Sequence, residues 1–313
     1  MRIGLQIPSF TWPEGTEGIG PTLAQIGRTA DEAGFASLWV MDHFFQIRGV
    51  GSVEEPMLEG YSALSYLAGV TERAKLGTLV TGVVYRYPGI LVKTATTLDV
   101  LSGGRAVCGL GLGWFAAEHR AYGWAFPSID ERYALLEDAL QCLPLLWGKG
   151  TPSFEGRVLH VPEALCYPRP LQDRLPILVG GNGERRTLRL AATYADACNI
   201  IGELDVVDRK IGALRAHCEA VGRDPAEVEV TQLSTTLVGR TGSEVAALLE
   251  RLRPRRTSAE RFAASVNAGT VDDQIGRFRA LANQGVGTAI VSLPDLDDTD
   301  PIERFGQVIG AFP

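Results

Sequence analysis

Eight short apolar runs recur along the chain, and most of them stay apolar at successive positions instead of alternating with polar residues. Continuous apolarity is typical of strands that are covered on both faces in a parallel sheet. The runs are "RIGLQI" from Arg2, "SLWVM" from Ser37, "AKLGTLVTGVV" from Ala74, "RAVCGLGLG" from Arg105, "PILVGG" from Pro176, "DACNII" from Asp196, "VEVTQLSTTLV" from Val228 and "GTAIVSL" from Gly287. The pattern predicts eight buried, parallel strands.

Helical patterns separate these runs, as in "PTLAQIGRTADEAG", which ends at a predicted C-terminal cap, Gly34, and in "DERYALLEDALQCLPLLWG". Eight β-then-α units in 313 residues favour an α/β fold of the (β/α)8 TIM-barrel type, as one domain over residues 1–313. An open, doubly wound sheet is the alternative. It is disfavoured because the first strand ends in "IPSF" and has no GxGxxG turn.

Two spacings are too long for a single helix. Residues 151–172, after the fourth strand, place Gly156 between short β-like runs and predict an inserted hairpin. Residues 251–269, after the seventh strand, form a second, charged insertion before the helical segment 270–285. The β-then-α rhythm resumes after both, so neither insertion is interpreted as a domain boundary.

Composition narrows the function classes. A hydrophobic content of 45% can bury a large core, while the net charge of −7 and the lack of a Lys/Arg block argue against nucleic-acid or anionic membrane surfaces. Small molecules are therefore the expected partners. The first residues are strand-like, with no leader pattern, and no apolar stretch could cross a bilayer, so we expect a cytoplasmic protein.

Cysteines and histidines do not predict a disulfide framework or a metal site. The five cysteines lie far apart without a CxxC pair, and we interpret them as buried thiols. The four histidines lack the spacing that a divalent ion would need, so no metal is expected.

Candidate chemistry lies where barrel strands end, because the loops at their carboxyl ends surround the active sites of such barrels. Asp42 and His43 follow the second strand. An imidazole that titrates near neutrality is a natural proton donor, and a neighbouring carboxylate can hold it charged. A purely structural histidine is the alternative. Glu118 and His119 follow the fourth strand and either line the same mouth or begin a solvated helix.

A glycine-rich turn follows the fifth strand and leads to a predicted helix beside Arg185 and Arg186; it consists of Gly180, Gly181, Asn182 and Gly183. Free N–H groups in such a turn, together with the helix dipole, can bind a phosphate. The alternative is a turn that only packs tightly.

Three glycines of the fourth strand, Gly109, Gly111 and Gly113, share one face. That face has no side chains, which suits either packing inside a crowded barrel or the floor of a flat ligand site.

Three long segments together resemble the bacterial luciferase-like monooxygenase superfamily, and within it the oxidoreductases that use the deazaflavin coenzyme F420. They are "SLWVMDHFF", "VTGVVYRYPGILVKTATTLDVLSGGRAVCGLGLGW" and "PILVGGNGERRTLRLAATYADACNI". The most specific piece is "TLDVLSGGR", Thr97 to Arg105, in which a helix, a tight Gly-Gly turn and a strand start occur together.

The resemblance implies a barrel with a deazaflavin ring, or alternatively FMN, across its C-terminal mouth. Its cofactor contacts would be Asp42, Thr81, Gly82, Val83, Gly111, Gly113, Gly180, Gly181, Asn182 and Gly183. A bulge of strand three with a non-proline cis peptide would support the ring, and the matching positions are Gly82 and Val83. Such a bond costs about 3 kcal/mol and persists only where the fold enforces it.

By the same resemblance, His43 is the expected proton donor. From their positions after the fourth strand, Trp114 and His119 are expected to face the substrate, and Glu118 is the candidate substitute acid. Sugar-phosphate dehydrogenases of this branch carry a glutamate directly after the strand-four glycines. Trp114 occupies that place here, which weakens the prediction of a sugar-phosphate activity and favours an apolar or planar substrate.

The expected activity is hydride transfer between F420 and a small organic substrate, by reduction of C=C, C=N or C=O or by the reverse oxidation of an alcohol. Two alternatives stay open: a two-component monooxygenase that uses reduced FMN, and a non-catalytic protein that binds a flavin or deazaflavin. Family members are often homodimers, so a homodimer is expected.

Overall fold

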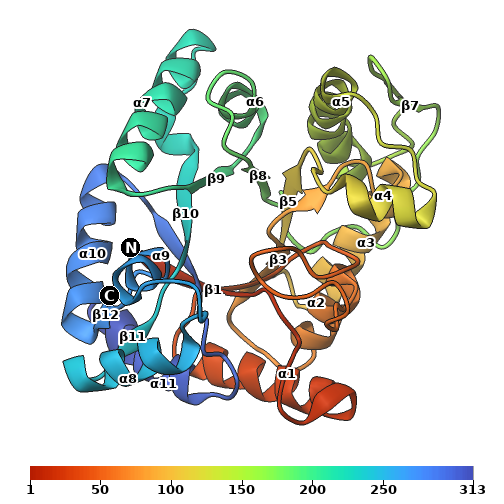
Figure 1. The fold of residues 1–313 in the computed structure, drawn as a ribbon. Coiled ribbons are helices and arrows are strands. Elements are labelled where there is room, and N and C mark those ends of the chain that lie inside the picture. The colour runs from red at the N-terminus through yellow and green to blue at the C-terminus, as the bar shows by residue number, and fades with distance from the viewer. Residues whose placement is uncertain (313) are drawn as a thin grey trace.

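The computed structural model describes residues 1–312, in which eight strand positions close into a ring of parallel strands (Figure 1). The strands are β1 (Arg2–Ile7), β2 (Ser37–Val40), β3 (Lys75–Thr78) with β4 (Thr81–Gly82), β5 (Ala106–Gly111), β8 (Ile177–Gly180), β9 (Ala197–Ile201), β10 (Glu229–Thr235) and β13 (Thr288–Ser292). Neighbours pair in the order β3-β2-β1-β13-β10-β9-β8-β5, and the pairing of β3 with β5 closes the ring. The predicted (β/α)8 barrel is confirmed.

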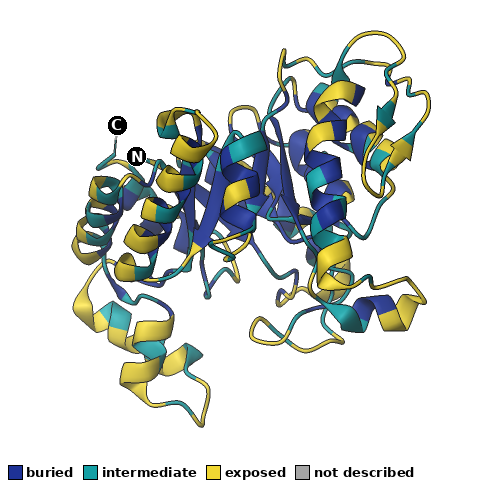
Figure 2. Ribbon diagram, turned by 90° about the horizontal axis from the view of Figure 1, so that it is seen from above, coloured by how far each residue is buried: buried dark blue, intermediate teal, exposed yellow. Residues whose placement is uncertain are grey.

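Helices surround this ring and cover the outer face of the strands (Figure 1). They are α1 (Gly15–Glu32), α2 (Gly60–Ala68), α3 (Pro88–Leu101), α5 (Ile129–Trp147), α6 (Thr187–Tyr194), α7 (Leu204–Ala220), α10 (Val271–Gln284) and α11 (Asp300–Ile309). Buried residues gather on the strands and on the inner sides of the helices (Figure 2). Gly34, just beyond α1, has φ +92°, a conformation that glycine adopts without strain, which confirms the predicted cap.

Apolar side chains fill the barrel on both faces of its strands. Every residue of β2 and β5 is buried, as continuous apolar runs predict. A separate inner cluster is centred on Trp39, Val107, Leu178 and Ile290. This cluster forms the base on which the residues at the barrel mouth rest. The five cysteines are buried, free thiols.

The third strand is interrupted. Gly77 pairs with Val107, and Thr81 pairs with Leu110. The third strand therefore advances by four positions where β5 advances by three, and the extra residue forms a bulge. The bulge contains a cis peptide bond between Leu79 and Val80. The expectation that the cis bond lies at Gly82–Val83 is therefore wrong. Gly82 has already returned to the ladder opposite Gly111, so the departure from regular pairing lies before Thr81.

The insertion after β5 contains α4 (Ala116–Tyr122) and, beyond α5, the antiparallel hairpin of β6 (Phe154–Glu155) and β7 (His160–Val161). The hairpin confirms the prediction for residues 151–172. Asp138 of α5 fixes it by accepting the N–H groups of Val158 and Leu159 at 2.6 and 2.9 Å. Asp99 of α3 fixes the return segment by accepting the N–H of Leu171 at 2.7 Å.

The insertion after β10 carries α8 (Gly242–Leu252) and α9 (Ala259–Ser265), and β11 (Val238–Gly239) pairs with β12 (Gly269–Thr270) at its base. The apolar run from Val228 is therefore divided, because its last residues leave the barrel sheet to form this second pairing. A short 3-10 helix, Pro225–Glu227, precedes β10.

Candidate active site

A cavity of about 330 Å³ lies at the carboxyl ends of the barrel strands. Its lining consists of Asp42, His43, Leu79, Val80, Gly82, Tyr85, Gly111, Leu112, Gly113, Trp114, Tyr133, Gly180, Gly181, Asn182, Gly183, Thr187, Asn199, Ile201 and Leu233. Ten residues singled out from the sequence are brought together in this lining. Four others, Thr81, Val83, Glu118 and His119, lie outside it.

Val80 explains the glycine pattern of strands β5 and β8. A Cβ atom on Gly111 would come within 2.6 Å of Val80, and one on Gly180 within 2.7 Å. A Cβ atom on Gly109 would overlap the carbonyl oxygen of Thr78. The glycines therefore leave space for the bulge of the third strand, and the bulge in turn forms part of the cavity wall.

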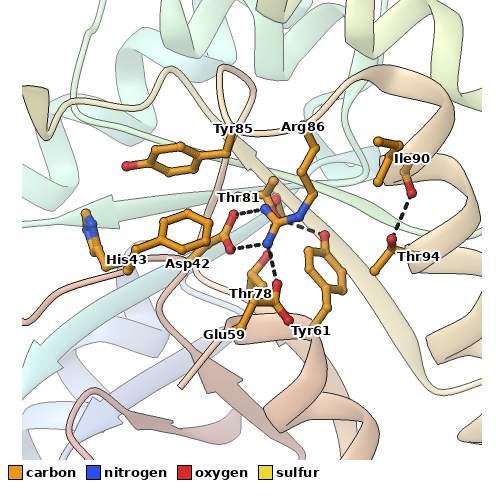
Figure 3. A network of polar contacts seen from close by, with 12 residues as sticks. Asp42, His43, Glu59, Tyr61, Thr78, Thr81, Tyr85, Arg86, Ile90 and Thr94 are labelled. Atoms are coloured by element: carbon orange, nitrogen blue, oxygen red, sulfur yellow. Dashed lines mark hydrogen bonds and ion pairs between the residues drawn. The ribbon is translucent and has the colours of Figure 1, made fainter. Parts of the chain in front are cut away.

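Asp42 is the acceptor in a buried ion-pair network (Figure 3). Arg86 donates to both of its carboxylate oxygens, at 2.5 and 2.8 Å, and also contacts Glu59 at 2.5 Å. The Arg86 guanidinium lies 5.0 Å from the ring centre of Tyr61. Burial raises the pKa of Asp42, and Arg86 opposes that rise. The bidentate pair fixes the carboxylate at the edge of the cavity.

Glu118 lies behind His43, fully buried. Both of its oxygens are 3.3 Å from Nδ1 of His43. The Phe44 and Phe45 N–H groups donate to it at 2.5 and 3.2 Å, and the Tyr85 hydroxyl donates at 2.5 Å. Burial raises the pKa of Glu118, but the bonds from His43, Tyr85 and Phe44 outweigh it and leave the pKa below its ordinary value.

The role of Glu118 as a second acid stays a prediction, and its contacts favour a carboxylate that holds His43 in place. A carboxyl that accepts this many donors is an anion at neutral pH, and it does not line the cavity. Burial and the neighbouring Glu118 also raise the pKa of Tyr85, so this phenol stays protonated and acts as a donor.

Three further predicted contacts support the cavity from behind. Thr81 is buried, with its hydroxyl 2.8 Å from that of Tyr61. Val83 packs into the hydrophobic core. His119 is 1% exposed, donates from Nδ1 to the Ala125 carbonyl at 2.7 Å and stacks on Tyr85. None of the three lines the cavity, so the cofactor contacts of Thr81 and Val83 and the substrate contact of His119 stay predictions without a contact to the cavity.

The glycine-rich turn after β8 runs along the cavity up to the start of α6. The backbone N–H groups of Asn182 and Gly183 donate no hydrogen bond to any group in residues 1–312. The Gly181 N–H belongs to the β8–β9 ladder, in which Gly180 pairs with Asn199. The Asn182 side-chain oxygen accepts from Lys210 of α7 at 2.6 Å, and Lys210 also donates to the Ile201 carbonyl at 3.1 Å. Burial lowers the pKa of Lys210. The turn thus presents free donors, with an amine beneath it.

Sequence reasoning gave no role to Arg86, Tyr85 or Lys210. Arg86 and Tyr85 follow the third strand, so the position rule for barrel loops covers them. Lys210 lies in the middle of α7, where no local pattern distinguishes it from a solvated lysine. Within residues 1–312, no group of three or more His, Cys, Asp or Glu side chains is arranged to hold a metal ion.

Comparison with known proteins shows the family of the chain. The family model of luciferase-like monooxygenases matches residues 1–289. The chain belongs to the luciferase-like monooxygenase family. The resemblance drawn from the sequence is thereby confirmed.

Curated relatives of this luciferase-like protein include the F420-dependent glucose-6-phosphate dehydrogenase of Kineococcus radiotolerans, 33% identical over 213 residues. The match covers 67% of this chain and 61% of that relative, so the chain spans less than two thirds of its length. This luciferase-like protein is similar to that relative over only part of either chain.

Solved structures share the fold over the full length. An F420-dependent secondary alcohol dehydrogenase superposes with a TM-score of 0.82 at 20% identity, covering 100% of this chain and 99% of that one. The EDTA monooxygenase of Chelativorans gives 0.81 at 18% identity, covering 100% and 95%. Likeness at this identity shows the fold alone. Within residues 1–312, no helix is long and apolar enough to span a membrane.

Proposed function

We propose that this luciferase-like protein is an oxidoreductase that transfers a hydride between coenzyme F420 and a small organic substrate. The observation that carries the proposal is one cavity that joins an apolar wall, a turn with free N–H groups and a single histidine. The F420-dependent activities of the curated relatives support the choice of cofactor.

The residues present fit a deazaflavin. Leu79, Val80, Leu112, Ile201 and Leu233 provide apolar surface for a flat ring. The free N–H groups of Asn182 and Gly183 suit a phosphate. Both groups of residues face one cavity. When bound, F420 supplies a two-electron donor or acceptor.

His43 is the proposed proton donor. Its Nδ1 is occupied by Glu118, so Nε2 is the nitrogen left to exchange a proton in the cavity. The Glu118 carboxylate accepts from Nδ1–H and balances the charge that forms when Nε2 is protonated. Glu118 is thus a positioning residue, and the Tyr85 hydroxyl and the Phe44 N–H hold its carboxylate in place.

Asp42 and Arg86 have a different role. Their pair lies at the edge of the cavity, where it fixes the loop that carries His43. The bidentate bond holds the Asp42 carboxylate in place, so we assign this pair a positioning role.

Equilibrium titration of the protein with F420 and with FMN, side by side and followed by fluorescence, tests the proposal. We expect tighter binding of F420 and no flavin-dependent oxygen consumption. Tighter binding of FMN would overturn the F420 assignment and favour a monooxygenase. Binding of F420 without turnover of any carbonyl, imine, alkene or alcohol would favour a non-catalytic binding protein.

A further inference from the structure

We infer that the substrate is an uncharged, planar, apolar molecule that lies against Trp114 beside His43. The inference rests on the proposed function and narrows it, because it excludes sugar phosphates and other anions as substrates. Three features of the cavity carry it: its aromatic wall, the charge around His43 and the engagement of the nearby cations.

The aromatic wall consists of Trp114 and Phe115, which follow strand β5. Each ring meets the His43 imidazole edge to face at 5.6 Å, with interplanar angles of 79° and 84°. Trp114 lines the cavity and is 60% exposed. An indole this exposed beside a functional group presents a free flat surface, and a planar apolar ligand that covered it would remove apolar area from water.

The charge around His43 disfavours anions. Asp42, Glu59 and Glu118 bring three carboxylates to this end of the cavity, against the one guanidinium of Arg86. The network is therefore net negative whether or not His43 is protonated. A phosphate or carboxylate placed next to His43 would meet like charge, which disfavours such ligands strongly.

The cations near this end are already engaged. Arg86 is paired with Asp42 and Glu59, and Arg132 donates to the carbonyls of Gly113 and Pro127 at 2.6 and 3.1 Å. No Lys or Arg of residues 1–312 lines the cavity itself. The free donors lie at the glycine-rich turn instead, where the proposed cofactor takes its phosphate. A sugar phosphate would have no partner left, although curated relatives are named glucose-6-phosphate dehydrogenases.

Calorimetric titration of the F420-loaded protein with three probes tests the inference: 2-acetylnaphthalene, 2-naphthoate and glucose 6-phosphate. The first two share a flat ring system and differ in charge. We expect the ketone to bind at least about tenfold more tightly than the carboxylate, and glucose 6-phosphate not to bind. Equal or tighter binding of either anion would overturn the inference.

The variant Trp114→Ala tests the aromatic wall. It should weaken ketone binding by about tenfold and leave the affinity for F420 within about twofold. Tyr66→Ala, which removes an exposed aromatic ring of α2 outside the cavity lining, is the control and should change neither. Unchanged ketone binding in Trp114→Ala would contradict the inference.

The F420 titration separates this inference from the proposed function. If F420 does not bind, the proposed function fails, and the same three probes are titrated into the cofactor-free protein. Preference for the ketone that depends on Trp114 would then still support the inference about the cavity, and preference for an anion would overturn it.

Discussion

The Val80 side chain fills the space that Gly111 leaves open, since an added Cβ atom at Gly111 would lie 2.6 Å from Val80 Cγ2 and 3.2 Å from the Gly180 carbonyl oxygen. Gly111→Ala should therefore overpack the bulge and destabilise the protein by about 1–3 kcal/mol, measured by urea unfolding. The shifted bulge should also weaken F420 binding.

The double variant Val80→Ala/Gly111→Ala is the internal check on that prediction, because it removes the clash and should recover part of the stability. Gly276→Ala, in the exposed face of α10 with open space around its Cα, is the matched control and should stabilise by roughly 0.5–1 kcal/mol. A Gly111→Ala protein as stable as the parent would contradict the packing argument.

His43→Ala removes the proposed proton donor, the one imidazole that residues 1–312 place in the cavity lining. We expect turnover to fall by roughly 10²–10⁴-fold, while the dissociation constant for F420 changes by less than about twofold. Steady-state kinetics and fluorescence titration measure the two quantities separately. Equal losses in turnover and affinity would remove His43 from the role of proton donor.

Glu118→Gln keeps the shape of the side chain but offers an amide where the carboxylate accepted. With its oxygen held by the Phe44 N–H at the Oε1 position, its NH₂ would take the Oε2 position, face Nδ1 of His43 and favour the tautomer that carries the proton on Nε2. We expect kcat to fall by roughly 10²–10⁴-fold with little change in F420 affinity, and the pH profile of kcat to shift. A purely structural role would leave that profile unchanged.

The same variant has a consequence for acid stability. The pKa of Glu118 is lower in the folded protein than its ordinary value, so its contribution to stability is present at neutral pH and is lost as the pH falls. As the pH falls below the ordinary range of a glutamate pKa, the parent protein should lose stability more steeply than Glu118→Gln, as urea midpoints over an acid series would measure. Parallel curves would show that folding does not lower the pKa of Glu118.

The local sequence pattern explains why the strands could be predicted and why the break in the third strand could not. The runs at Arg2, Ser37 and Arg105 are apolar because both faces of each strand are covered, so the sequence of each run by itself indicates a buried strand. The break at Leu79–Val80 cannot be detected in this way, because the apolar run continues through it. The glycines that accommodate Val80 lie in other strands, so their purpose emerges only when the barrel closes.

The candidate site was predictable where a residue's position in the chain fixed its place. His43, Trp114 and Asn182 lie just after the ends of strands. Because the carboxyl ends of the strands surround the active site of such a barrel, their place in the cavity lining was predictable. Glu118 and His119 lie further from the end of β5, in α4, and neither lines the cavity. Arg86 acquires its role only through Asp42, a partner more than forty residues away whose position depends on the folded barrel.

Arg86→Met tests the buried pair. Asp42 would keep its charge in a buried place without a partner, so we expect a loss of roughly 3 kcal/mol or more in the free energy of unfolding. Adding Asp42→Asn in the same chain removes the uncompensated charge and should restore part of that loss. If the double variant is no more stable than Arg86→Met alone, the two residues are not coupled as the ion pair requires.

Lys210→Met tests whether the amine beneath the glycine-rich turn supports a phosphate. Lys210 holds the side-chain oxygen of Asn182, and that contact orients the turn in which the N–H groups of Asn182 and Gly183 are free. The variant should weaken binding of F420 and FMN by roughly tenfold, as expected for the loss of a hydrogen bond to a charged group. Riboflavin and the deazaflavin riboside, which lack the phosphate, should bind as they do to the parent. Equal losses for compounds with and without phosphate would show that Lys210 shapes the ring site, so the comparison separates the two ends of the cavity.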